Sequence, residues 1–303
     1  MPHPPLHLRL PATSANLGPG FDALGLAMAL YLTIDAAPAD AFHIQATGRN
    51  ADQCAIIDNN LILTTYLDVL TSNAIDAPRL HLQLHNEIPL GMGCGSSATA
   101  LLAGVLLADH FGNLRWTRQQ ILEEACRREG HPDNVAACLL GGMTISSMDD
   151  QAVTTATCGE DLDWALLLAL PAAGLATSKA RALLPATYSR QNAVANIQAT
   201  SLLVAAFTQN RPELLRIAMR DRIHQPYRMQ ACPLLPQLLP LLGTHPVLWG
   251  VALSGAGPSV LLIAPRSETN GLLPAIRQAA GDPDLEILQT HIARGALASW
   301  PRS

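Results

Sequence analysis

The chain is almost without lysine: of its 19 basic residues, 18 are arginine, and the one lysine, Lys179, lies far from any glycine cluster. A phosphate-binding loop of the G-x-x-x-x-G-K-[ST] type needs a lysine beside its glycines, and protein kinases need one on an ATP-binding strand. Both classes of nucleotide-binding protein are therefore excluded.

Aromatic residues are also scarce, with four each of Phe, Tyr and Trp, and the net charge is −5. Because no basic stripe or stacking surface is present, nucleic acid is not an expected partner. The six cysteines contain no C-x-x-C motif, which argues against zinc ribbons and disulfide frameworks and fits a reducing cytosol. The longest apolar run, residues 164–176, contains Pro171 and is shorter than the ~20 residues of a membrane helix. The first ten residues resemble no signal peptide, so we expect a cytoplasmic location and no membrane partner.

The 303 residues, 49% of them hydrophobic, suffice for one large domain or two ordinary ones. Strand-like runs alternate with helical periodicity, and a polar stretch at 146–160 separates two such series. In the first series we predict strands at 6–10, 30–34 and 80–84 and helices at 60–70, 98–111 and 117–128, the last with Thr117 as N-cap. In the second we predict a strand at 165–170, helices at 192–209 and 212–222, and two strands flanking Gly255. We therefore expect two parts, 1–155 and 156–303.

The strongest motif is the segment Leu90-Gly91-Met92-Gly93-Cys94-Gly95-Ser96-Ser97, between a predicted strand and a long apolar helix. Its glycines let backbone N–H groups converge, and the helix N-terminus adds partial positive charge, so the segment favours phosphate. The spacing differs from G-x-G-x-x-G, which excludes a Rossmann loop. Without a lysine, a metal must compensate a triphosphate, and Ser96 or Ser97 can offer a hydroxyl to Mg²⁺. The alternative is a structural turn with serine as helix cap.

Polar residues gather in five further segments. Residues 11–22 follow a strand and contain Asn16 and Asp22, residues 128–135 form a helix junction, and residues 254–259 lie between two strands. Arg181 and Arg228 belong to two arginine-bearing segments, and guanidinium groups bind carboxylates bidentately. Each segment also has a purely structural interpretation: a loop of turn-forming residues at 11–22, simple helix capping at 128–135, a hairpin turn at 254–259 and solvated surface arginines.

In order and spacing, the three loops that contain glycine and serine, at 11–22, 90–97 and 254–259, resemble the three motifs of the galactokinase, homoserine kinase, mevalonate kinase and phosphomevalonate kinase superfamily. The resemblance covers the chain almost from end to end. The segments 11–22, 130–135 and 221–228 are similar specifically to its homoserine kinase branch. This resemblance implies an α+β two-domain small-molecule kinase fold, with a left-handed β-α-β nucleotide-binding unit in an N-terminal half and a ferredoxin-like C-terminal half. It also implies ATP and Mg²⁺ as cofactors, L-homoserine as substrate and transfer of phosphate to its hydroxyl, and it leaves a homodimer open.

The resemblance further assigns roles to numbered positions. Asn134 and Asp133 are the catalytic candidates, and because mevalonate kinase-like relatives have Asp where Asn134 stands, catalysis is expected to rest on positioning and charge neutralisation. Ser97 and Glu129 are expected at the metal, with Glu123 or Glu124 as alternatives to Glu129. The substrate-binding positions are Asn16, Asp22, His131, Arg181 and Arg228. The ATP-binding positions are Asn60, Pro89, Leu90, Gly91, Met92, Gly93, Cys94, Gly95, Ser96 and Ser97.

Two loop residues depart from the family pattern, which commonly has Arg or another residue at position 92 and Leu at position 94. The missing positive charge at Met92 is expected to weaken nucleotide binding. Three alternatives remain open: another small-alcohol kinase of the superfamily, a diphosphomevalonate decarboxylase, and a catalytically silent ligand sensor. The scarcity of basic residues argues against the second, and intact Ser97, Glu129, Asp133 and Asn134 against the third.

Overall fold

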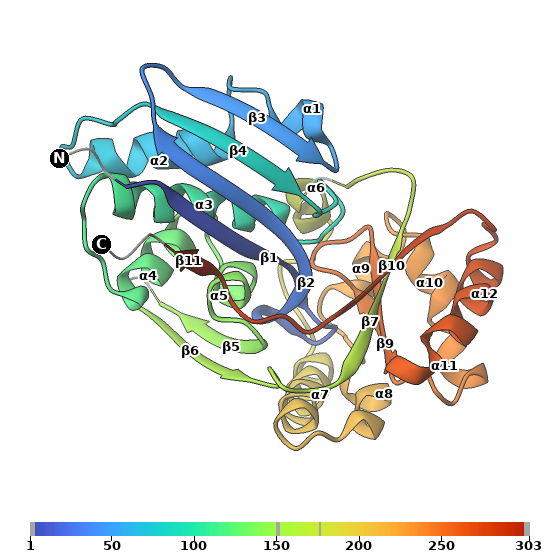
Figure 1. Cartoon of the computed structure of the whole chain (residues 1–303). Helices are drawn as coiled ribbons and strands as arrows, with labels where there is room; N and C mark the ends of the chain where they lie inside the picture. The colour runs from blue at the N-terminus through green and yellow to red at the C-terminus, as the bar shows by residue number, and fades with distance from the viewer. Residues whose placement is uncertain (1–3, 150–151, 176, 300–303) are drawn as a thin grey trace.

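The computed structural model describes residues 4–149, 152–175 and 177–299, which form two β-sheets with helices packed against them (Figure 1). The first sheet has the order β11-β1-β2-β4-β3, and β2 also pairs with β5, which pairs with β6. Only β3 and β4 are parallel within this sheet, and α1 and α2 connect them. Its strands are β1 (Leu6–Asn16), β2 (Gly20–Pro38), β3 (His43–Gly48), β4 (Leu80–Asn86), β5 (Met143–Met148), β6 (Val153–Cys158) and β11 (Leu297–Ser299).

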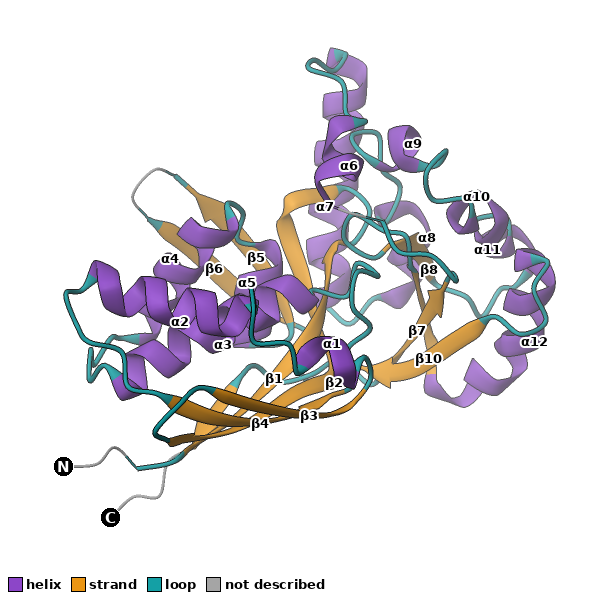
Figure 2. Ribbon diagram, turned by 90° about the horizontal axis from the view of Figure 1, so that it is seen from above, coloured by secondary structure: helices purple, strands orange, loops and turns teal. Residues whose placement is uncertain are grey.

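Helices cover one face of this sheet (Figure 2). The alternation in β4 explains why, because Leu80, Leu82 and Leu84 are buried while the residues between them are half-buried or exposed. The helix that carries the glycine motif at its start lies deep in this layer and is apolar nearly all round. The helices are α1 (Ala51–Cys54), α2 (Leu61–Ser72), α3 (Ser96–Phe111), α4 (Arg118–Glu129) and α5 (Asp133–Leu140).

The second sheet is antiparallel with the order β10-β7-β9-β8. One group of helices connects β7 to β8 and another connects β9 to β10, which is the β-α-β-β-α-β arrangement of ferredoxin-like folds. The strands are β7 (Trp164–Leu170), β8 (Gly250–Leu253), β9 (Val260–Pro265) and β10 (Glu286–His291). The helices are α6 (Thr177–Ala182), α7 (Arg190–Thr208), η1 (Pro212–Leu214), α8 (Leu215–Ala218), α9 (Gln225–Arg228), α10 (Leu234–Leu238), α11 (Leu241–Thr244), η2 (Arg266–Glu268) and α12 (Thr269–Ala280).

The strand β7 is apolar throughout because both of its faces are buried. Leu166 and Leu168 belong to the large core that includes Phe207 of α7, whereas Leu167 and Ala169 belong to a second core with residues of α10 and α12. The run of apolar residues that the sequence shows here is therefore a central strand between two helix layers. In the part of the chain that the structure describes, no helix is long and apolar enough to cross a membrane.

Several predicted elements are confirmed, and three predictions are wrong. The helices at 60–70, 98–111, 117–128 and 192–209 correspond to α2, α3, α4 and α7, and Thr117 caps α4 in a capping box with Gln120. The segment 146–160 is no linker, since β5 and β6 pair there as a hairpin of the first sheet. The helix at 212–222 ends at Ala218. Residues 11–16 and 20–22 continue β1 and β2, so the turn between them is much shorter than predicted.

The predicted division between residues 155 and 156 falls inside β6. In addition, β11 returns from the C-terminal part and pairs with β1, as Figure 1 shows where the last strand lies beside the first. The two sheets thus do not divide the chain at a single point, and the domain boundary stays a prediction.

Candidate active site

A cavity of about 550 Å³ brings together the motifs that lie far apart in the sequence. Its wall consists of the β1–β2 turn, the segment before α2, the glycine loop, the α4–α5 junction, part of α6, α9 and the β8–β9 turn. Sixteen predicted site residues line it: Asn16, Asp22, Asn60, Leu90, Gly91, Gly93, Cys94, Gly95, Ser96, Ser97, Glu129, His131, Asp133, Asn134, Arg181 and Arg228. Pro89 and Met92 do not line this cavity. They line a neighbouring cleft together with Arg49 and Glu286.

The glycine loop adopts a conformation that favours glycine, with φ angles of 70° at Gly91, 74° at Gly93 and 71° at Gly95. Gly95 is the N-cap of α3, so the alternative of a serine cap is wrong. Among the described residues no side chain caps this helix end, which leaves the first-turn N–H groups available to an anion in the cavity.

Neighbouring segments hold this loop in place. Thr13 donates its backbone N–H to the Cys94 carbonyl at 3.0 Å, and the Ser254 hydroxyl donates to the Gly93 carbonyl at 2.7 Å. Met92 does not line the cavity, and burial raises the pKa of the Cys94 thiol to about 12. Neither of the two unusual loop residues therefore adds a charge to the cavity wall.

Substitution of single glycines in this loop separates packing from backbone strain. A Cβ at Gly93 would lie 2.2 Å from the Ser254 carbonyl oxygen, whereas a Cβ at Gly91 would have nothing within 4 Å. Gly93→Ala is therefore expected to cost about 1–3 kcal/mol more of the free energy of unfolding than Gly91→Ala, since both share the strain of a positive φ. Denaturant unfolding of the two variants measures this difference. Equal stabilities would show that the β8–β9 turn does not fix the loop.

At the α4–α5 junction, Asp133 organises its neighbours. Its side chain is 2% exposed, and its Oδ1 atom lies 2.6 Å from His131 Nδ1 and accepts the backbone N–H of Asn134 at 2.7 Å. Asn134 Oδ1 in turn accepts a hydrogen bond from the Thr13 hydroxyl at 2.7 Å. Both side chains at the start of α5 are thus held from two sides, as a site that works by positioning requires.

The junction is also acidic. Burial raises the pKa of Glu129, and the charge of Asp133 adds to this effect. Burial alone would lower the pKa of His131, but the hydrogen bond to Asp133 and the charges of Asp133 and Glu129 outweigh it, so this pKa is raised. Asp22, His131 and Asp133 bring their polar atoms within 4.8 Å of one another. The raised pKa of His131 opposes the neutral imidazole that a metal needs, and Asp22 pairs with Arg181, so this cluster suits a polar substrate better than a metal.

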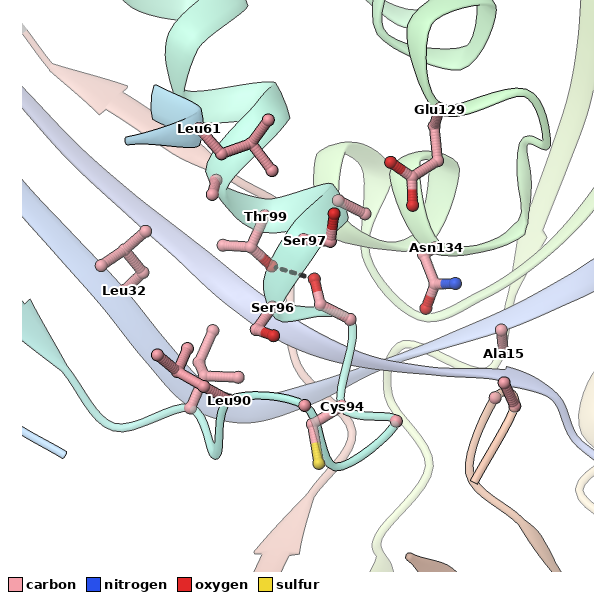
Figure 3. A pocket seen from close by; sticks show the side chains of 18 of the residues that line it. Ala15, Leu32, Leu61, Leu90, Cys94, Ser96, Ser97, Thr99, Glu129 and Asn134 are labelled. Carbon is pink, nitrogen blue, oxygen red and sulfur yellow. Dashed lines mark hydrogen bonds between the residues drawn. The ribbon is translucent and has the colours of Figure 1, made fainter. Parts of the chain in front are cut away.

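Oxygen atoms suited to Mg²⁺ lie elsewhere in the cavity. In Figure 3, Glu129 reaches from the end of α4 toward the space beside Ser97 and Asn134. A carboxylate and a hydroxyl are hard oxygen ligands, so Ser97 and Glu129 fit the ion. Glu123 and Glu124 line a different pocket, and Glu124 is bound to Arg127 and Arg128 at 2.7 Å each. Position therefore favours Glu129 over its two alternatives.

Two guanidinium groups face the cavity in different states. Arg181 is 38% exposed and forms a bidentate ion pair with Asp22, with distances of 3.0 and 2.6 Å. Arg228 is 1% exposed and, among the described residues, has no carboxylate partner. Both guanidinium carbons lie 5.4 Å from the centre of the Phe21 ring. Burial and the charge of Arg181 lower the pKa of Arg228, as expected for a cation that lacks a counterion.

The end of the cavity around Asn60 has an apolar wall, and the sequence did not predict the residues of this wall. Asn60 uses its side chain within its own loop: Oδ1 accepts the N–H groups of Ile62 and Leu63 as the cap of α2, and Nδ2 donates to the Cys54 and Ile56 carbonyls. The apolar wall consists of residues that the sequence pattern identifies only as ordinary core or surface positions. They are Leu32, Leu84, Ile88, Leu61 and Ile56, and Ile56 is 54% exposed. Phe21, Gly255 and Ala256 also line the cavity, and they lie in the predicted segments 11–22 and 254–259, although none of the three had an assigned role. A local motif search does not find the apolar residues of this wall, because they are defined by contacts across the fold.

The comparisons with known proteins agree with this geometry. The family models "GHMP kinases N terminal domain" and "GHMP kinases C terminal" match residues 60–142 and 203–280, which defines the class. The chain is 47% identical to a homoserine kinase of Solibacter usitatus over 86% of this chain and 85% of the relative. It is 37% identical to a homoserine kinase of Bacillus mycoides over 93% of this chain and 94% of the relative.

Solved structures show the same fold. The crystal structure of a homoserine kinase from Cytophaga hutchinsonii superposes with a TM-score of 0.81 at 23% identity and covers 97% of both chains. A galactokinase from Lactococcus lactis superposes with a TM-score of 0.69 at 12% identity, over 97% of this chain and 95% of the other. This chain belongs to the homoserine kinase family of the GHMP kinases.

Proposed function

We propose that the protein transfers the terminal phosphate of ATP to the side-chain hydroxyl of L-homoserine, with Mg²⁺ bound at Ser97 and Glu129. One observation carries this proposal: a single cavity connects an anion-binding loop, through a row of neighbouring polar groups, to a buried guanidinium that has no carboxylate partner among the described residues. A Cβ at Gly95 would approach Asn134, Asn134 adjoins Asp133, Asp133 lies near Asp22, and Asp22 binds Arg181. An acceptor bound along this row has its hydroxyl at the phosphate loop and its carboxylate at the arginines.

For ATP, the loop of residues 91–97 offers backbone N–H groups to the phosphates, with the N-terminus of α3 behind them. The apolar wall of Leu32, Leu84 and Ile88 suits the flat face of a nucleobase. Bound Mg²⁺ supplies charge neutralisation on the phosphates, which this loop cannot supply itself because it has no lysine.

For homoserine, Arg228 and Arg181 suit the α-carboxylate, and Asp22 and Asp133 suit the α-ammonium group. The hydroxyl then lies near Asp133 and Asn134. Asn134 orients the homoserine hydroxyl but cannot act as a base. The proton of this hydroxyl therefore passes to a phosphate oxygen or to water, or is shared with Asp133 during transfer. Phosphoryl transfer has a loose transition state, so alignment and charge neutralisation contribute most of the rate.

Loss of the metal is expected to abolish activity. Because no lysine stands in the loop, excess chelator should remove essentially all ADP release, and added Mg²⁺ should restore it. Ser97→Ala is expected to raise the Mg²⁺ concentration needed for half-maximal rate by roughly 10-fold, since it removes one oxygen ligand. Thermal unfolding of the same variant controls for folding, and full activity in excess chelator contradicts the metal assignment.

The substrate itself is tested by ADP release with homoserine, mevalonate, shikimate and sugars as acceptors. We expect homoserine to give the highest kcat/KM. A higher kcat/KM for another alcohol would mean that the enzyme acts on a different class of substrate. The cytoplasmic location and the homodimer stay predictions.

A further inference from the structure

Arg228 is a buried cation whose orientation needs an explanation. Its Nε atom donates to the Ala180 carbonyl at 3.3 Å, and Nη1 lies 3.5 Å from the Gly255 carbonyl, which is at the limit of a hydrogen bond. The shortest contact of its guanidinium is with a side chain, the imidazole of His224, whose Nδ1 atom lies 3.1 Å from Nη1. None of the sequence motifs assigned a role to His224.

His224 is itself buried and uses both ring nitrogens. Its side chain is 0% exposed, Nε2 lies 2.7 Å from the Gly18 carbonyl, and the ring stacks on Phe21 with centroids 5.4 Å apart. Asp221 binds the backbone N–H groups of residues 223, 224 and 225 and so fixes the start of α9, which holds both His224 and Arg228 in position.

The partners of the ring determine its proton. A carbonyl oxygen accepts only, so Nε2 carries the hydrogen and donates to Gly18. An arginine donates only, so Nδ1 must present its lone pair to Arg228. A second proton on Nδ1 would place two donors face to face. Burial and the charge of Arg228 lower the pKa of His224 against the opposing charge of Asp221, which agrees with a neutral ring.

We propose that neutral His224 is a positioning residue: it turns the Arg228 guanidinium toward the substrate carboxylate and ties this orientation to the β1–β2 turn through Gly18. This inference rests on the proposed role of Arg228 in binding the carboxylate. The link joins two segments that both contribute to the cavity, since Asn16 and Asp22 flank the same turn. Specificity for a carboxylate-bearing alcohol therefore depends on a side chain that does not itself touch the substrate.

Two amide substitutions separate the two hydrogen bonds of the ring. In His224→Asn the amide oxygen can take the place of Nδ1, so the acceptor for Arg228 is kept and the donor to Gly18 is lost. In His224→Gln the amide nitrogen can take the place of Nε2, so the donor to Gly18 is kept and the acceptor is lost. The measurements are kcat and KM for homoserine, KM for ATP, and thermal unfolding.

His224→Gln is expected to raise the KM for homoserine roughly 10-fold or more while kcat and the KM for ATP stay within about twofold. His224→Asn is expected to keep the KM for homoserine within about threefold of the parent. An unchanged KM in the glutamine variant overturns the proposal, and so does an equal rise in both variants or an equal rise in the KM for ATP. If the glutamine variant does not fold, the asparagine variant alone decides, because a 10-fold rise there also overturns it.

The variant Arg228→Leu separates a failure of this inference from a failure of the proposed function on which it rests. If Arg228→Leu leaves the KM for homoserine unchanged, the carboxylate assignment is wrong and the role of His224 falls with it. If Arg228→Leu raises this KM and His224→Gln does not, the proposed function stands and only the role of His224 is wrong.

Discussion

Replacement of Arg228 by leucine is expected to lower kcat/KM for L-homoserine roughly 30-fold to several thousand-fold, with little change in the KM for ATP. A charge-assisted contact to a carboxylate in a closed site contributes on the order of 2–5 kcal/mol. Arg228 is 1% exposed, so water cannot replace the lost contact, and Arg181 is already paired with Asp22. Steady-state kinetics with varied homoserine and varied ATP measure both effects.

The stability of this variant provides an independent check. Arg228 is buried without a carboxylate partner among the described residues, and removal of such a charge relieves desolvation rather than breaking an ion pair. The substitution also leaves the Ala180 carbonyl and His224 Nδ1 without a donor, so we expect Arg228→Leu to unfold at a temperature close to that of the parent. Arg181→Leu serves as a comparison with a smaller expected effect, because Arg181 is 38% exposed. The exposed Arg220, which does not line the cavity, is the matched control for loss of a charge. A change below threefold in both cavity variants would rule out the carboxylate assignment.

Asp133→Asn is expected to reduce kcat for homoserine by roughly 100-fold, as expected when the reacting hydroxyl is no longer held in line. The substitution removes the negative charge that holds His131 and leaves only a neutral amide oxygen to accept the Asn134 backbone N–H. Asp133 lies in the first turn of α5, where a negative charge is stabilised, so some loss of thermal stability accompanies the loss of rate. Single-turnover kinetics separate chemistry from binding, and a kcat within threefold of the parent would exclude Asp133 from the reaction.

Asn134→Asp is the informative contrast, because it adds a carboxylate without removing one. The new side chain can still accept the Thr13 hydroxyl, so the local geometry should survive. The site already contains Asp133, Glu129 and the phosphates of bound ATP, and a further anion raises the proton affinity of its neighbours. We therefore expect no gain in kcat between pH 6 and 9. A variant several-fold faster than the parent, with a new pKa on the acidic limb, would show that the enzyme lacks a base it can use.

Most local elements and many residues of the site could be predicted from the amino-acid sequence. Helical periodicity and helix capping depend on neighbours within about one turn, so a sequence pattern can predict them. This applies to the amphipathic helices α2 and α4, the apolar helix α3 and the capping box at Thr117. The glycine loop and its lack of a lysine likewise indicated phosphate binding with a metal. The motifs at 11–22, 90–97, 130–135 and 221–228 carried the resemblance that the comparisons confirmed.

The remaining features of the site depend on contacts between residues far apart in the chain, so local sequence patterns do not predict them. Glu129 and Glu124 are both carboxylates on α4, and the helix rotation and its packing decide that one faces the cavity while the other binds arginines. The polar segment 146–160 pairs as a hairpin because β2 offers a free edge to β5, which no local propensity encodes. His224 lies in an ordinary polar stretch, yet folding places it between Gly18 and Arg228, 206 and 4 residues away. Its hydrogen-bond pattern exists only once both segments meet, because burial removes the water that would otherwise satisfy each group.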